Sequence, residues 1–125
     1  MEVKCATSFD ERFDPNNVTT RDNKQFWITT GLYPQELLID LQGTRQVNEV
    51  RFVTTGAKKI LIEGCKTSNS SDFKKVGESK ELGGKTGGFQ TDSVRLTDQA
   101  PYSQLKFIIQ EGWDDFTSVH NIEIV

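Results

Sequence analysis

The segment Glu36-Leu37-Leu38-Ile39-Asp40-Leu41 decides the fold, because its apolar residues recur at every second position. In an extended chain Leu37, Ile39 and Leu41 lie on one face, which is typical of a strand with one buried side. The segment Leu105-Lys106-Phe107-Ile108-Ile109-Gln110 repeats this alternation nearer the C-terminal end. A period of two at both places predicts a protein built from β-strands.

Short apolar runs of this kind recur along the chain and are separated by turn signals such as Gly43, Gly56 and Ser-Asn-Ser-Ser at 68–71. We predict about eight strands, near residues 2–6, 36–41, 47–55, 58–67, 73–80, 88–96, 103–111 and 118–125. The one helical turn expected lies at Pro15-Asn16-Asn17-Val18. This spacing predicts an all-β fold, an antiparallel β-sandwich of jelly-roll type, in a single domain over residues 1–125.

Composition and charge argue against two classes of protein. The 125 residues carry a formal net charge of −3, whereas a nucleic-acid binder needs a basic face to neutralise phosphates. No stretch approaches the roughly 18–20 apolar residues of a membrane span. Cys5 and Cys65 follow no metal-ligand spacing, and no apolar leader follows Met1, so we expect reduced thiols in an intracellular protein.

Residues that could carry catalysis are few. His120 is the single histidine, and no Gly-x-Ser-x-Gly turn accompanies it, so we interpret it as a structural or interface residue. Asp114-Asp115 is read as a solvated turn. Gly83-Gly84-Lys85-Thr86 resembles the end of a phosphate loop, but Ser79 stands where that pattern needs its first glycine. The sequence therefore predicts a binding module and not an enzyme.

Aromatic residues in the connections are the candidate contact surface. Trp27 follows Phe26 directly, and neighbours in an extended chain face opposite ways, so we expect Trp27 to be buried and Phe26 partly shielded. Aromatic side chains are favoured anchors at interfaces. The candidate partner-binding residues are Tyr33, Tyr102, Trp113, Phe116 and His120. The alternative interpretation is that each aromatic residue caps an end of the core.

Motifs at both ends of the chain are similar to those of a known family. The N-terminal ones are Ala6-Thr7-Ser8-x-Asp10-Glu11, Pro15-x-Asn17-Val18 and Phe26-Trp27-x-Thr29-Thr30-Gly31-Leu32-Tyr33-Pro34-Gln35-Glu36. The C-terminal ones are Leu105-x-Phe107-Ile108-Ile109 and Asp114-x-Phe116-x-Ser118-Val119-His120. In this order they resemble the intraflagellar transport protein 25 family, also called heat shock protein beta-11.

This resemblance implies a discoidin-like, galactose-binding-domain-like jelly roll that acts without catalysis in the cilium or flagellum and the cytoplasm. The implied partners are a Rab-like small GTPase, intraflagellar transport protein 27, in a heterodimer, and other subunits of the intraflagellar transport B complex. Neither nucleic-acid binding nor membrane insertion is expected.

The resemblance also implies a calcium site in the loop that precedes Trp27. The ligands that remain in this chain would be the Val18 and Thr20 carbonyls and the Asp22 carboxylate. Thr20-Arg21 stands where relatives have Asp-Gly, so calcium is expected to bind weakly or to be lost.

Two alternatives stay open. A carbohydrate-binding discoidin-like module fits the same fold and the same loop aromatics. A hydrolase would require His120 to lie in a cleft, within about 3 Å of a Ser or Cys nucleophile.

Overall fold

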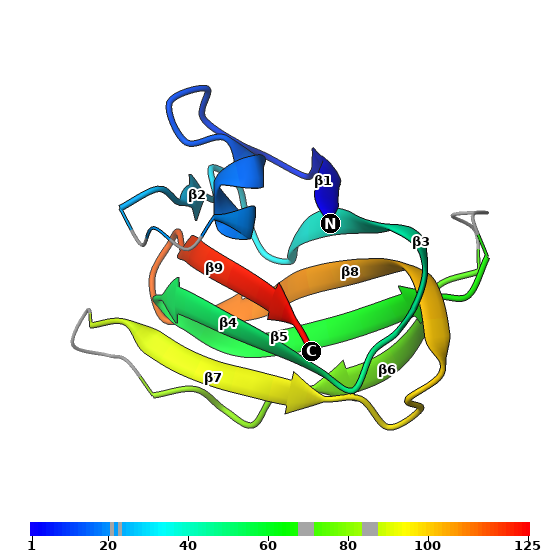
Figure 1. Cartoon of the computed structure of the whole chain (residues 1–125). Helices are drawn as coiled ribbons and strands as arrows, with labels where there is room; N and C mark the ends of the chain where they lie inside the picture. The colour runs from blue at the N-terminus through cyan, green and yellow to red at the C-terminus, as the bar shows by residue number, and fades with distance from the viewer. Residues whose placement is uncertain (21, 23, 68–71, 84–87) are drawn as a thin grey trace.

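The computed structural model describes residues 1–20, 22, 24–67, 72–83 and 88–125. These residues form nine strands and one 3-10 helix. In chain order they are β1 (Glu2–Ala6), η1 (Pro15–Thr19), β2 (Trp27–Ile28), β3 (Gln35–Gln46), β4 (Glu49–Thr55), β5 (Ala57–Cys65), β6 (Lys74–Glu78), β7 (Gln90–Arg95), β8 (Pro101–Gly112) and β9 (Ser118–Ile124) (Figure 1). The predicted phosphate-loop resemblance at Gly84–Thr86 lies outside the described residues.

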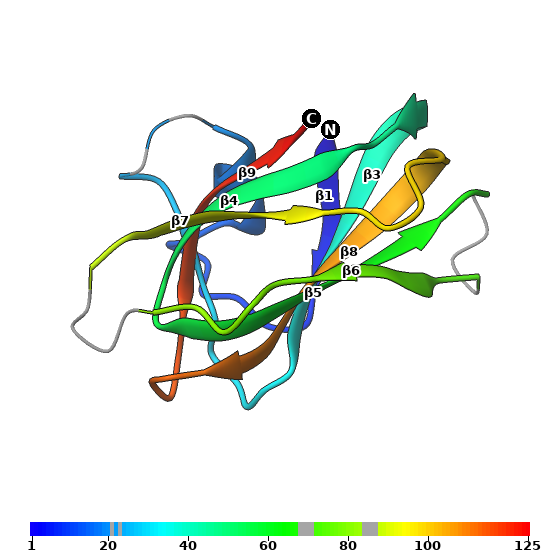
Figure 2. The ribbon, with the colours of Figure 1, turned by 90° about the horizontal axis from the view of Figure 1, so that it is seen from below.

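The strands form two antiparallel sheets that pack face to face. One sheet has the order β1-β3-β8-β5-β6 and the other the order β2-β9-β4-β7. Consecutive strands alternate between the sheets except for β5 and β6, which pair in one sheet, and the view from below shows the two layers (Figure 2). The predicted antiparallel sandwich of jelly-roll type is therefore confirmed.

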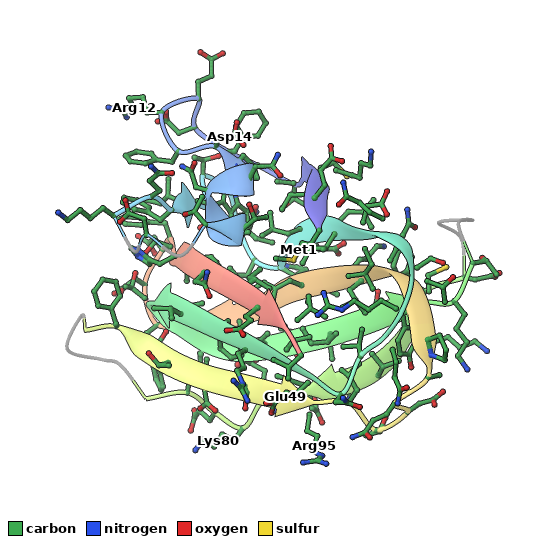
Figure 3. All side chains as sticks on the ribbon, in the orientation of Figure 1. Met1, Arg12, Asp14, Glu49, Lys80 and Arg95 are labelled. Carbon is green, nitrogen blue, oxygen red and sulfur yellow. The ribbon has the colours of Figure 1, made fainter. Side chains whose placement is uncertain are left out.

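The core lies between the sheets and is built from the alternating residues. Leu37 pairs with Phe107 in the register of β3 and β8, and both side chains are fully buried. From the other sheet, Phe52 meets Phe107 edge-on, with ring centroids 5.5 Å apart. Each such side chain contributes about 1.5–3 kcal/mol when buried. Side chains fill the space between the layers, while Lys80 and Arg95 project outward at the lower edge (Figure 3).

Two predictions about the strands need correction. The prediction of eight strands missed β2, which has only two residues and therefore carries no period of its own. The sequence predicts a turn at Gly43, but β3 continues past this residue to Gln46. Gln42 and Gly43 both have positive φ, and the register with β8 shifts between Asp40 and Arg45, so Gly43 forms an irregularity within the strand.

Candidate functional site

One end of the sandwich, at the left of Figure 1, brings together the connections β2–β3, β4–β5 and β8–β9. The Tyr33 hydroxyl donates a hydrogen bond of 2.7 Å to the Asp114 carbonyl. The Trp113 backbone N–H donates to the Gly56 carbonyl at 2.7 Å, and its indole donates to Leu82 at 2.8 Å. Leu32 and Phe116 remain exposed, by 88% and 56%. This end of the sandwich therefore exposes apolar side chains on connections that hydrogen bonds hold together.

Gln35 explains why two of the three N-terminal motifs occur together. Its buried carbonyl oxygen accepts hydrogen bonds from the hydroxyls of Thr7, at 2.7 Å, and Ser8, at 2.5 Å. Its amide nitrogen donates to the Leu32 carbonyl at 2.5 Å. One buried side chain thus fixes the strand end after β1 to the β2–β3 connection, which positions Leu32 and Tyr33.

Four rings from separate segments contact one another in sequence and are here called the aromatic row: Phe13, Phe26, His120 and Phe89. The centroid distances along it are 4.7 Å from Phe13 to Phe26, 4.8 Å from Phe26 to His120 and 4.8 Å from His120 to Phe89. Phe89 is 60% exposed, and Phe26 is half-buried beside the fully buried Trp27, as predicted. The sequence did not reveal the row, because no spacing links its members.

His120 lies near a hydroxyl group but not in a cleft. Its Nε2 is 2.9 Å from the Ser118 Oγ, and the same Oγ is bonded to the Thr55 hydroxyl. The two rings that flank His120 cover it, and the side chain is 6% exposed. Neither His120 nor Ser118 lines any of the five pockets that the structure describes. Ser118 and His120 are two residues apart in one strand, so their side chains lie on the same face. This contact between neighbours favours the structural interpretation of His120.

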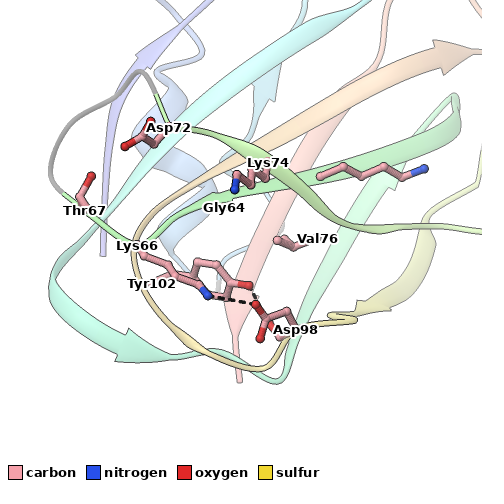
Figure 4. A pocket seen from close by; sticks show the side chains of 9 residues that line it. Gly64, Lys66, Thr67, Asp72, Lys74, Val76, Asp98 and Tyr102 are labelled. Carbon is pink, nitrogen blue, oxygen red and sulfur yellow. Dashed lines mark hydrogen bonds and ion pairs between the residues drawn. The ribbon is translucent and has the colours of Figure 1, made fainter.

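Tyr102 lies at the opposite end of the sandwich from the other candidate contact residues. It is 1% exposed, and its hydroxyl donates to the Asp98 carbonyl at 2.7 Å. Its ring forms the floor of a pocket of about 450 Å³, whose lining includes Lys66, Asp72 and Lys74 (Figure 4). Lys66 pairs with Asp98 at 3.1 Å across the rim. Tyr102 is a core residue and is not part of the contact surface proposed below.

The pKa values of both tyrosines reflect these surroundings. Burial raises the pKa of Tyr33 above its ordinary value, and the Asp114 and Asp115 carboxylates add to the shift. Burial also raises the pKa of Tyr102, with Asp98 contributing. Both phenols therefore stay neutral at physiological pH and act as hydrogen-bond donors.

The three predicted calcium ligands are engaged by other groups of the chain. The Val18 and Thr20 carbonyls both accept from the side-chain amide of Asn121 in β9. The exposed Asp22 carboxylate accepts instead from the Lys24 backbone N–H at 2.9 Å. Arg21 lies outside the described residues. In the part of the chain that the structure describes, no group of three or more His, Cys, Asp or Glu could hold a metal ion. The donor set does not fit calcium, which prefers six to eight oxygen ligands.

Two further observations concern the predictions about the cysteines and about a membrane span. Cys5 is exposed, Cys65 is buried, and the two form no disulfide. Within the described ranges, no helix combines the length and the apolar composition that crossing a bilayer demands.

Solved structures share the fold at low sequence identity. Chitosan-binding module 1 of a Paenibacillus sp. IK-5 chitosanase/glucanase superposes with a TM-score of 0.82 and 16% identity, over 97% of this chain and 92% of that one. The family 32 carbohydrate-binding module of Clostridium perfringens NanJ, solved with galactose, gives 0.79 and 16%, over 96% and 90%. Such identities support the β-sandwich fold alone.

Sequence relatives identify the family. No protein-family model matches the chain. It is 32% identical over 123 residues to intraflagellar transport protein 25 of Chlamydomonas reinhardtii, covering 98% of this chain and 64% of that protein. The chain therefore spans slightly less than two thirds of the algal protein. The human homolog is 31% identical over 121 residues, covering 97% of this chain and 83% of the relative. On this similarity, the chain belongs to the intraflagellar transport protein 25 family.

Proposed function

We propose that this protein is a non-enzymatic subunit of the intraflagellar transport B complex, acting in the cilium or flagellum and the cytoplasm. Membership of the intraflagellar transport protein 25 family is the observation that carries this proposal. Its direct partner in the proposal is a Rab-like small GTPase, intraflagellar transport protein 27, in a heterodimer. The protein supplies a rigid binding surface, and the GTPase supplies the nucleotide chemistry.

The exposed side chains at the β2–β3 and β8–β9 end are the proposed contact surface. Leu32 and Phe116 are solvent-exposed apolar groups beside the half-buried Tyr33 and Trp113. An apolar centre on a base fixed by hydrogen bonds is the arrangement that interface hot spots favour, because little conformational entropy remains to be lost. His120 contributes from beneath, by supporting Phe26 and Phe89.

Binding to the purified GTPase tests both the partner and the surface. The two proteins are mixed at micromolar concentration and analysed by size-exclusion chromatography and calorimetry. Wild-type protein is expected to form a one-to-one complex. Phe116→Ala and Leu32→Ala are each expected to weaken it about tenfold or more, since hot-spot truncations cost about 2 kcal/mol or more.

Lys74→Ala is the matched control, because Lys74 is exposed and lines the pocket at the opposite end. It should bind like wild type. Two monomers that never associate would contradict the proposed partner. A complex that tolerates both apolar substitutions would contradict only the proposed surface.

Carbohydrate binding is the second candidate, because the structural neighbours include modules solved with sugars. Sugar recognition commonly uses an aromatic face that the ligand can cover. The largest described pocket has only the buried ring of Tyr102 at its floor, which leaves little face for stacking. A glycan array decides this alternative: strong, selective binding would favour it over the transport role.

A further inference from the structure

The last turn of η1 and the residue that follows it hold two carbonyl groups close to one donor. The Nδ2 of Asn121 lies 2.5 Å from the Thr20 carbonyl oxygen and 3.5 Å from the Val18 carbonyl oxygen. These are the two carbonyls that the family resemblance offers to a calcium ion. Asn121 lies in β9, about a hundred residues later in the chain, and η1 lies beside β9 (Figure 1).

The chemistry of the amide suits this position. A side-chain amide nitrogen carries two N–H donors, so one group can serve two carbonyls. The assignment of nitrogen and not oxygen to this position follows from the surroundings, because both neighbours are acceptors only. A cation placed between these carbonyls would have to displace the amide, and it would gain few anionic ligands in exchange.

Asp22 and Asn17, among the described residues of the loop, form local hydrogen bonds. The Asp22 carboxylate accepts from Lys24, and the Asp22 carbonyl accepts from the Gln25 N–H at 2.9 Å. The Asn17 side-chain amide donates to the Phe26 carbonyl at 3.1 Å, which closes the other side of the loop. Two asparagine amides thus hold the segment that leads to Trp27.

We infer that the side-chain amide of Asn121 takes the place of the cation in this protein, so that hydrogen bonds and not a metal ion fasten the η1 loop to β9. Asn121 is half-buried and opposes Val53 in the register of β4 and β9, so the sheet fixes its backbone. The loop is therefore preorganised without calcium.

Thermal melting of the full chain tests this inference. Samples in EDTA, in excess calcium and in excess magnesium are compared by circular dichroism. A site filled at about 100-fold excess over Kd would raise Tm by several degrees. The Tm of the wild-type protein is expected to differ by less than about 1 °C between the three conditions. A calcium-specific rise of several degrees in wild type would overturn the inference.

Two substitutions at Asn121 sharpen the test. Asn121→Ala removes both hydrogen bonds and is expected to lower Tm by about 3–6 °C in EDTA. Asn121→Asp replaces the donor by a carboxylate that faces two carbonyls, so it is expected to melt below wild type in EDTA. Calcium should then raise its Tm measurably above the value in EDTA, because the new carboxylate faces the two carbonyls and supplies the anionic charge that calcium prefers.

Asn48→Asp is the matched control, since Asn48 is exposed directly before β4. It should show no calcium response. An Asn121→Asp protein that ignores calcium would contradict the assignment of this position as the cation site. If that variant does not fold, wild type and Asn121→Ala decide: an Asn121→Ala protein as stable as wild type would also overturn the inference.

Discussion

The indole N–H of Trp27 donates a hydrogen bond of 2.8 Å to the backbone carbonyl of Ser8. Trp27 is fully buried and lies in β2, whereas Ser8 follows β1 in the other sheet. The Ser8 hydroxyl in turn accepts from the Thr30 backbone N–H at 3.0 Å. The N-terminal segment is therefore tied to the β2 segment from both sides, which places the loop end of the sandwich.

Trp27→Phe tests how much this bond contributes. The substitution keeps a buried ring but leaves the Ser8 carbonyl without its donor and opens space beside the smaller side chain. We expect the free energy of unfolding to fall by about 1–3 kcal/mol, the range for an unsatisfied buried polar group. Urea unfolding followed by circular dichroism measures the change.

Trp113→Phe is the comparison variant for this bond. It also removes an indole donor, to Leu82 at 2.8 Å, but Trp113 is only half-buried, so water can replace it. The free energy of unfolding should therefore fall less in Trp113→Phe than in Trp27→Phe. Equal losses would show that burial does not set the cost of the missing bond.

Gly64→Ala should disturb the core at the opposite end. A Cβ at this position would lie 2.8 Å from two ring carbons of Tyr102, and the Tyr102 hydroxyl is held by Asp98. Since the ring cannot retreat without losing that bond, we expect destabilisation of about 1–3 kcal/mol. Gly88→Ala, which meets no atom within 4 Å, should stay within about 0.5 kcal/mol of wild type in the same urea experiment. Indistinguishable stabilities would contradict the close packing of Gly64 on Tyr102.

The core could be predicted from the sequence because its period is local. Leu37 and Phe107 each stand in a run whose alternation alone assigns them inward, and the register then pairs them. The position of Tyr102 could not be predicted in this way. An aromatic residue beside a turn suggests exposure, and only the fold shows that Gly64 leaves room for its ring.

The contacts of the candidate site join residues that lie far apart in the chain, and no spacing in the sequence predicts such contacts. Asn121 reaches Thr20, about a hundred residues earlier in the chain, because η1 packs beside β9. The rings of Phe13 and Phe89 come from segments far apart in the chain, and the rings of Phe26 and His120 connect them. The family motifs did indicate this region, since Gln35 joins two of them.

The two cysteines should differ in reactivity. Cys5 is exposed on β1, whereas Cys65 is buried and its thiol donates to the Thr67 carbonyl at 3.1 Å. Ellman's reagent is therefore expected to label one thiol per native chain rapidly and the second only in guanidinium. Cys5→Ser should abolish the rapid phase. Rapid labelling of both thiols in native protein would contradict the burial of Cys65.

The tyrosines predict how stability changes at alkaline pH. Tyr33 and Tyr102 are the two tyrosines of the chain, and burial raises the pKa of each above the ordinary value of 10.0. Above about pH 10 the unfolded chain releases protons that the folded chain retains, so stability is complete below that pH and falls as pH rises through the folded pKa values. Ultraviolet absorbance of the phenolate should therefore titrate later in native protein than in guanidinium. Tyr33→Phe should leave one titrating group, still shifted upward and assignable to Tyr102. A native curve that superimposes on the unfolded one would contradict the burial of both phenols.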